Sequence, residues 1–365
     1  MSFLVTRAAL AVALVFVANT AKAQTNGKLT QAQGAVFIKT GEGAEQAGKT
    51  GESVPGGTRI RTGADGQAEV TFADGTKMQV RPGTTVALSN AKRNEQKSSV
   101  VLFFGRVWSK VSRSVGAETN FEVNTPNAVA GVRGTEFETA VADDGTAKVR
   151  VTEGKVAVAS DVDSEAEDVS RGEETTADAK GVGDAASSSG EAQWDKFSSD
   201  GSARAKKDGG TIAKGMRERL DARRQKLQSL RERQTQLVKQ RDSALKRAEM
   251  GDSAAAAEVK KAEKELATLG SQIADLADAS ESQFGYVDHL ADLANDPRFG
   301  MIDRKTMLAE AKTLRKLKAQ FDAMVKEGTD LSMKSMDKMM DDMQKGKPTI
   351  KDKKGSSAKD LFDEK

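Results

Sequence analysis

The sequence predicts an α+β multi-domain protein, with an N-terminal all-β domain followed by an α-helical hairpin or coiled-coil bundle. Apolar residues alternate with polar ones up to about residue 158 and later recur every three or four positions. The first period is that of half-buried strands and the second is that of helices. The charge changes as well, from twelve acidic and three basic residues over 161–200 to six acidic and fifteen basic residues over 201–250.

The all-β part is predicted to consist of many short strands. Alternation is clearest at Ala68, Val70 and Phe72, and the run 100–104 is apolar on both faces, which predicts a central strand. Turn signals separate the runs at Asp65-Gly66, Asp74-Gly75 and Asp144-Gly145. We therefore expect a β-sandwich or a short β-solenoid.

The helical part is predicted over residues 204–345, after an acidic and Gly/Ser-rich linker at 179–203. A leucine seam marks the first helix, at Leu220, Leu227, Leu230 and Leu237. The break at Gly251 leaves Asp252 or Ser253 to cap a second helix, and the two form an antiparallel hairpin.

A third helix is expected between Asp303, as its cap, and Gly328, as its end. Four methionines follow within residues 333–343, and we interpret them as packing or partner contacts because no cysteine or histidine lies nearby. The last segment, 346–365, is expected to be disordered.

Residues 1–23 have the features of a secretory signal peptide. Arg7 precedes eleven apolar residues over 8–18, and Ala21 and Ala23 fit the small-x-small pattern of a cleavage site. Eleven residues are too few to cross a bilayer, which takes about 20. We therefore expect cleavage after Ala23, a periplasmic or secreted chain, and no stable membrane span after cleavage. An uncleaved anchor is the alternative.

The composition excludes several kinds of catalytic and metal-binding site. The chain has no cysteine and one histidine, His289. This excludes disulfides, thiol catalysis, thiolate metal sites and zinc sites made of several imidazoles. Acidic residues are plentiful, but the sequence places no pair of them in a cleft. We predict no enzymatic activity, no cofactor and no metal site.

Two glycine-containing motifs look like phosphate-binding loops. Residues 43–50 match G-x-x-x-x-G-K-[ST], but Gly51 and Pro55 prevent the helix that must begin there. Residues 131–134 match the G-x-x-G of KH domains, but strand-like residues flank them in place of helices. We interpret both as chance matches and predict no nucleic-acid partner.

Four motifs in order resemble the FecR domain, over about residues 32–178. They are GESVPGGTRIRTGADGQAEVTFADGTKMQV at 51–80, VVLFFGRVWSKV at 100–111, FEVNTPNAVAGVRGTEFETAV at 121–141 and KVRVTEGKVAVAS at 148–160. The third is the most specific. The resemblance implies a periplasmic module that binds a ligand or a protein in signal transduction and is not an enzyme.

The resemblance places a candidate contact site in the third motif. Its members are Thr125, Pro126, Gly131, Arg133, Gly134, Thr135 and Phe137. Arg133 is either exposed and paired with an anionic group of a partner, or buried along its stem and bonded to turn carbonyls or Glu136. We favour the second interpretation, because a motif shared by proteins with different partners maintains the fold.

Together these features predict a non-enzymatic binding or signalling adaptor of the cell envelope. The expected partner is an envelope protein or an anionic envelope polymer, and the helices offer a route to self-association. One alternative is a structural envelope protein that assembles through its helical region. Another is a membrane-anchored sigma-factor regulator, which requires that the N-terminal segment is not cleaved.

Overall fold

The structure is a computed structural model. It describes residues 26–344 except 42, 90–97, 114–120, 162–163, 189 and 191, and for 249, 253, 329 and 331–344 it describes the backbone. The predicted signal peptide and the predicted disordered tail lie outside the described residues.

In the part of the chain that the structure describes, eighteen strands form two layers that are joined by one long strand, β9 (Ser98–Lys110). The first layer runs in the order β4 (Ser53–Val54), β1 (Gly27–Gln33), β6 (Gln67–Phe72), β7 (Lys77–Val80), β9, β12 (Glu136–Val141), β13 (Ala147–Glu153) and β16 (Glu173–Asp178), with β17 (Gly181–Val182) and β18 (Ala186–Ser187) on β16.

The second layer runs in the order β3 (Gln46–Ala47), β2 (Val36–Thr40), β5 (Thr58–Thr62), β8 (Thr85–Leu88), β9, β10 (Phe121–Asn124), β11 (Val129–Val132), β14 (Lys155–Ala159) and β15 (Ala166–Ser170). Every pair in it is antiparallel except β9 with β10.

Strand β9 changes layers at Gly105. Its first half pairs with β8 and β10, and its second half pairs with β7 and β12. Gly105 has a φ of +93°, and a Cβ there would lie 2.6 Å from the Thr84 Cα. Only glycine fits a left-handed corner with so close a neighbour. This corner folds the strands into a sandwich, which confirms the all-β domain and the central position of residues 100–104.

One apolar core fills the space between the layers. Both layers contribute buried side chains to it, and Phe72 from β6 meets Phe121 from β10 edge-on at 5.4 Å. The turns at Asp74-Gly75 and Asp144-Gly145 connect paired strands, with Gly75 and Gly145 at positive φ as predicted. The turn at Asp65-Gly66 instead carries the chain from β5 in one layer to β6 in the other.

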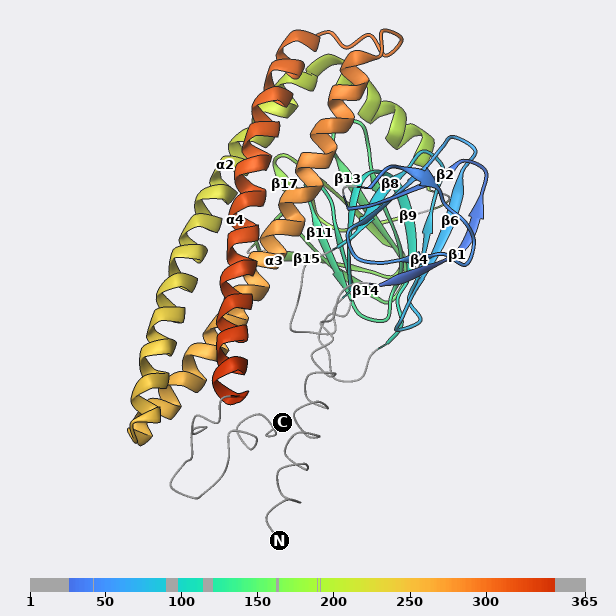
Figure 1. Cartoon of the computed structure of the whole chain (residues 1–365). Helices are drawn as coiled ribbons and strands as arrows, with labels where there is room; N and C mark the ends of the chain where they lie inside the picture. Colours follow the sequence, from blue (N-terminus) through green and yellow to red (C-terminus); the bar gives the residue numbers. More distant parts are fainter. Residues whose placement is uncertain are drawn as a thin grey trace.

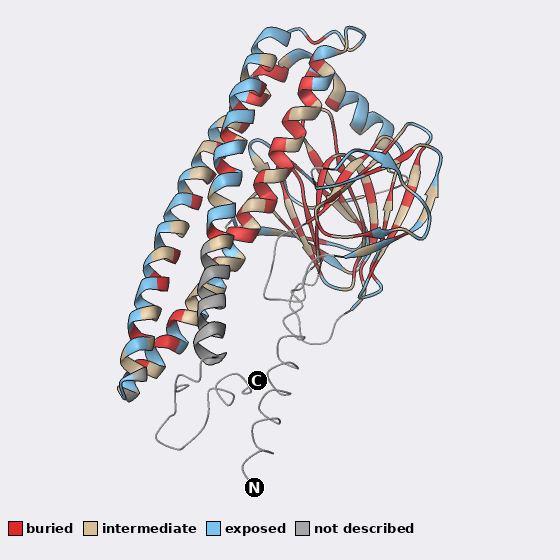
Figure 2. Ribbon diagram, viewed as in Figure 1, coloured by how far each residue is buried: buried red, intermediate tan, exposed pale blue. Residues whose placement is uncertain are grey.

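Three long helices follow the strands: α2 (Trp194–Glu249), α3 (Ser253–Asn295) and α4 (Arg304–Gln344). Asp252 caps α3 by accepting hydrogen bonds from the backbone N–H groups of Ala254 and Ala255. Apolar seams of the three helices share one core. Figure 1 shows α3 alongside the strands, and Figure 2 shows that the outward turns of α2 and α4 are exposed.

Two expected boundaries are wrong. Gly328 does not end the third helix, because α4 continues to Gln344. It is instead a point of close approach, since a Cβ at Gly328 would lie 2.6 Å from Arg231 Nη1 of α2. The expected linker at 179–203 contains β17, β18 and the start of α2. The methionine-rich segment lies in α4. No helix among the described residues is long and apolar enough to cross a membrane.

Candidate functional site

The Thr125-Pro126 turn of the third motif docks onto α3. Thr125 Oγ1 donates to the Ala128 carbonyl at 2.8 Å and accepts from the Ala128 N–H at 2.9 Å, which closes the turn. The carbonyls of the turn then point at the helix. Ser282 Oγ donates to the Thr125 carbonyl and Gln283 Nε2 donates to the Pro126 carbonyl, each at 2.9 Å. The turn therefore binds a part of its own chain.

The outer face of β9 supplies the apolar part of this contact. Phe103 is buried against Gly285 of α3, where a Cβ would lie 2.1 Å from the ring. Arg59 also lies over the Phe103 ring, with its Cζ 4.4 Å from the ring centroid. The neighbouring Phe104 stacks on His289 with ring centroids 3.8 Å apart. The two apolar faces of residues 100–104 thus face the sandwich core and α3.

The surface of the strand region that contacts α3 has a carboxylate near each end: Asp278, which is buried, and Asp143, which is partly buried. Near one end, Asp278 of α3 accepts hydrogen bonds from Ser89 Oγ at 2.8 and 2.7 Å and from Ser99 Oγ at 3.1 Å. Asp278 is 6% exposed. A buried carboxylate needs such donors, because desolvation otherwise disfavours its charged form. These contacts fix the rotation of α3 against the strands.

At the other end, Asp143 in the β12–β13 turn connects the strands to two helices. His289 Nε2 lies 2.7 Å from its Oδ1, Ser202 Oγ of α2 donates to its Oδ2, and Tyr286 Oη donates to its carbonyl at 2.7 Å. Burial alone would raise the pKa of Asp143, but the hydrogen bonds from His289 and Ser202 lower it. Burial raises the pKa of Tyr286 far above its ordinary value.

The remaining motif residues lie away from α3. Gly131 is in β11, Phe137 is fully buried in the sandwich core, and Thr135 Oγ1 donates to the Lys155 carbonyl at 3.0 Å. Gly134 has a φ of +60°, and a Cβ there would lie 2.1 Å from Arg113 Cγ. Arg133 is exposed. The structure separates the motif into a docking turn and a strand corner.

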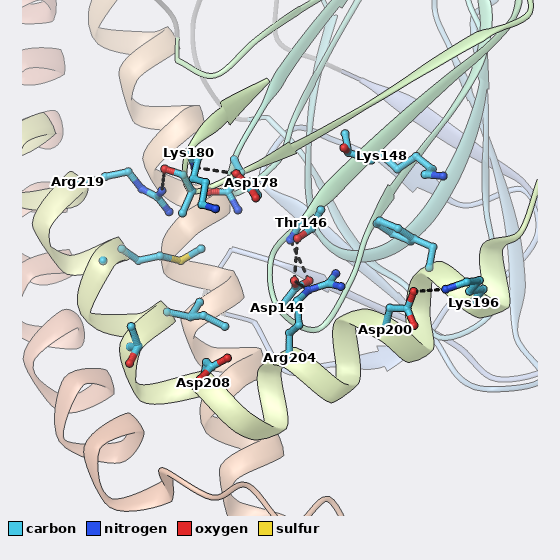
Figure 3. Close-up of a pocket in the computed structure, with 18 of the residues that line it drawn as sticks. Asp144, Thr146, Lys148, Asp178, Lys180, Lys196, Asp200, Arg204, Asp208 and Arg219 are labelled. Carbon is cyan, nitrogen blue, oxygen red and sulfur yellow. Dashed lines mark hydrogen bonds and ion pairs between the residues drawn. The ribbon is translucent and has the colours of Figure 1, made fainter. Parts of the chain in front are cut away.

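Beside the docked surface lies a groove of about 840 Å³ between the first strand layer and α2. Figure 3 shows Arg219 and Lys180 at one end, Lys196 and Asp200 at the other, and Asp144 with Arg204 between them. Three cations in the groove are already paired. Arg204 bonds to Asp144, Lys196 bonds to Asp200 at 2.7 Å, and Lys148 bonds to Glu174 at 2.8 Å.

Two residues that line the groove, Asn127 and Arg219, each have a buried polar atom without a hydrogen-bond partner among the described residues: Asn127 Oδ1 and Arg219 Nε. The Asn127 amide is oriented by its other end, where Nδ2 donates to the Gly145 carbonyl at 2.7 Å. Arg219 Nη1 donates a long hydrogen bond to the Ala179 carbonyl, at 3.5 Å. Burial, and after it the neighbouring Arg223, lowers the pKa of Arg219.

A kink in α2 creates the groove. Asp208 has a non-helical φ of −119° and ψ of 16°, so the first turns of α2 lie on the strand layer while the rest joins the bundle. The Gly209-Gly210 pair follows the kink, and the side chains of Met301 and Asp303 pack closely against its backbone. The Ile302 N–H donates to the Lys206 carbonyl at 2.9 Å and satisfies a group that the kink exposes.

The comparisons with known proteins identify the strand region. The family model described as FecR protein matches residues 58–157. These residues are a FecR domain. The match lies within the range of the sequence resemblance and includes the docking turn, the Gly134 corner and β9. It excludes all three helices. No functionally curated protein matches the chain.

Two solved structures are similar to the chain. Both are crystal structures of a candidate anti-sigma factor from Parabacteroides distasonis, at 1.65 and 2.50 Å resolution. Each is 25% identical, with a TM-score of 0.28, and the alignment covers 32% of this chain and 53% of that protein. The chain thus matches about half the length of that protein.

Sequence analysis missed the residues that build the docked surface and the groove. Gly209-Gly210, inside a helical pattern, was a usable signal for the kink. Asp143, Asp278 and Asn127 gave no such signal, because their partners lie far away in the sequence; Asp278 and Ser89 are 189 residues apart. Among the described residues, no three acidic or histidine side chains come together to hold a metal ion.

Proposed function

We propose that this chain is a non-enzymatic binding and signalling adaptor of the cell envelope, in which the FecR domain and the three helices act as one body. The observation that carries the proposal is the groove, because the strand layer and α2 both line it.

The docked turn supports the same view. The Thr125-Pro126 turn, which belongs to the most specific FecR motif, accepts two hydrogen bonds from α3. The FecR domain therefore positions the helices. A partner that enters the groove contacts Asp144 and Lys148 of the strand layer together with Arg204 of α2. Binding there can change the contact between the two parts, which gives an adaptor a means of passing on a signal.

Assembly through the helices remains the alternative. The seam residues Leu220, Leu227 and Leu237 are buried within the chain, so they are already used in its own bundle. A structural role therefore needs a different surface. A single species at monomer mass in multi-angle light scattering would favour the adaptor, and concentration-dependent growth would favour the structural protein.

A photo-crosslinker tests the proposal. We would place p-benzoylphenylalanine at Thr211, which is exposed and lines the groove, and a control at Lys239, which is exposed on the remote part of α2. The full mature chain is then irradiated in an envelope extract. The proposal expects a defined adduct from position 211 alone. Adducts of equal yield from both positions, or from neither, would contradict it.

A further inference from the structure

Two large apolar side chains are well exposed among the described residues. Ile302, in the loop between α3 and α4, is 75% exposed, and Met250, in the turn between α2 and α3, is 80% exposed. Figure 1 shows these two connections at opposite ends of the helical bundle. A single exposed apolar residue is common on protein surfaces. The charges around each residue decide whether it belongs to a larger surface.

Six exposed lysines lie on the parts of α2 and α4 that adjoin Ile302. The Ile302 N–H donates to the Lys206 carbonyl at 2.9 Å, and Arg217 of α2 pairs with Glu310 of α4 at 2.8 Å, so these parts of the two helices lie side by side. None of the six lysines has an ion-pair partner among the described residues. We call them, together with Ile302, the lysine surface: Lys206, Lys207 and Lys214 of α2, and Lys305, Lys312 and Lys316 of α4.

The three lysines of α4 form a row on its outward face. Steps of seven and four residues separate Lys305, Lys312 and Lys316, and residues at such steps lie on one face of a helix. The buried Met307 and Leu314 of α4 face the helical core instead. The row begins three residues after Ile302. An exposed apolar side chain therefore lies at the end of a row of cations.

The acids nearby do not balance this charge. Two of them are already paired, Asp296 with Arg298 at 2.8 Å and Glu310 with Arg217 at 2.8 Å. The six lysines and the exposed Arg304 face four carboxylates that have no ion-pair partner among the described residues. These are Asp208 and Asp303, which are partly buried, and Asp292 and Glu218, which are exposed. The net charge of this part of the surface is therefore positive.

The surroundings of Met250 are different. Arg247 pairs with Asp252 at 3.4 Å and also with Glu258. Met250 therefore provides a matched apolar site at which the neighbouring arginine is neutralised.

The chemistry of the lysine surface favours many dispersed anions over one tightly held anion. A lysine ammonium is a compact, hydrated point charge and lacks the fork with which arginine holds a carboxylate or a phosphate. Lysines spread along a surface are attracted to a bilayer that contains anionic lipids, and an apolar side chain beside them can enter the boundary between headgroups and acyl chains. A soluble polyanion offers the charge but no apolar layer for Ile302.

We propose that the lysine surface binds an anionic phospholipid bilayer, with Ile302 in the boundary between headgroups and acyl chains and the lysines at the anionic headgroups. This is a peripheral contact that needs no membrane-spanning segment. None of the six lysines lines the groove, so the inference concerns a second surface and goes beyond the adaptor function proposed above.

Vesicle co-sedimentation of the full mature chain tests this inference. The vesicles contain equal parts of phosphatidylglycerol and phosphatidylcholine, or phosphatidylcholine alone, and soluble polyphosphate serves as the competitor. The test variants are Ile302→Ser and the pair Lys305→Glu with Lys312→Glu. The matched controls make the same changes at exposed positions towards the other end of the bundle: Met250→Ser, and Lys239→Glu with Lys246→Glu.

The chain is expected to bind the vesicles with phosphatidylglycerol but not those without it, and to be released at about 1 M salt, where the Debye length is about 3 Å. Reversing Lys305 and Lys312 should weaken binding about 30-fold or more, because each lysine at an anionic surface contributes about fivefold. Ile302→Ser should weaken binding about tenfold through the loss of apolar burial. Each control should weaken it by less than about threefold, because distant charges are screened.

Equal binding to the two kinds of vesicle would overturn the inference. Equal weakening by the two lysine pairs would also overturn it, because the attraction would then depend on net charge and not on this surface. If Ile302→Ser binds as tightly as the natural chain and polyphosphate displaces the vesicles, the surface binds soluble polyanions and the membrane assignment is wrong. These outcomes do not affect the crosslink at Thr211, so the two proposals fail separately.

Discussion

Two glycines of α3 provide a direct test of whether the helices are docked on the FecR domain. At Gly285 a Cβ would lie 2.1 and 2.3 Å from atoms of the Phe103 ring, whereas at Gly270 a Cβ would meet nothing within 4 Å. Both are inside the same helix, so alanine at either position gains about 0.5–1 kcal/mol from helix propensity and reduced chain entropy. The two variants therefore differ only in the contact with β9.

Gly270→Ala should stabilise the protein by about 0.5–1 kcal/mol. At Gly285 the added methyl must displace the buried Phe103 ring, over which Arg59 also lies with its Cζ 4.4 Å from the ring centroid. Overpacking of this kind costs about 1–3 kcal/mol. Gly285→Ala should therefore be less stable than Gly270→Ala by about 1–3 kcal/mol, since the helix gain is common to both.

The assay is urea unfolding followed by far-UV circular dichroism and by tryptophan fluorescence, which reports on Trp108 of β9 and Trp194 of α2. A shift in the midpoint at constant slope measures the change in stability. Equal stabilisation by the two substitutions would refute the reasoning, because it would mean that Gly285 is not pressed against Phe103.

Three further predictions concern the motif, pH and processing. Gly134→Ala should destabilise by about 1 kcal/mol or more, because of its positive φ and the contact with Arg113, whereas exposed Arg133→Ala should stay within about 0.5 kcal/mol in the same urea assay. Asp143→Asn should destabilise the protein more near pH 6 than at about pH 3. In the folded protein the pKa of this carboxyl is below its ordinary value of about 3.9. Its contribution to stability is therefore present above that ordinary value and is lost as the pH falls through the folded-state pKa. Equal destabilisation at both pH values would contradict the predicted pH dependence. Mass spectrometry of the exported chain should find Gln24 at its N-terminus, and an intact N-terminal segment would favour the anchored alternative.

The strands and helices could be predicted from the sequence because the patterns that indicate them involve residues close together in the chain. Two strands follow from patterns of adjacent residues: the alternation at 68–72 and the apolar run at 100–104. The cap of α3 is also local, because Asp252 bonds to the backbone of Ala254 and Ala255. The FecR resemblance was also local, since each motif lies within about thirty residues. Such local patterns identify a domain, but they do not show which other part of the chain it contacts.

The arrangement of the parts could not be predicted in this way. The contact of Ser282 with Thr125 joins residues 157 positions apart, and neither residue has a sequence context that names the other. Phe103 illustrates the limit. Its place in an apolar run indicated a strand covered on both faces, but not that α3 is the cover. Gly328 shows the opposite error, because a local rule predicted a helix end at a glycine where α4 continues and packs against Arg231 of α2.

An engineered disulfide tests the central claim, that the FecR domain and the helices form one docked body. Both carboxylate oxygens of Asp278 lie within 2.8 Å of Ser89 Oγ, so cysteines at these two positions come within bonding reach. The natural chain has no cysteine to compete. The matched control, Ser89→Cys with Gly270→Cys, moves one thiol about 12 Å along the same helix.

After mild oxidation, peptide mass spectrometry of the Ser89→Cys/Asp278→Cys chain should show one disulfide within a monomer, and the control pair should remain reduced. Two free thiols in the first variant, or disulfides only between chains, would contradict the docked arrangement.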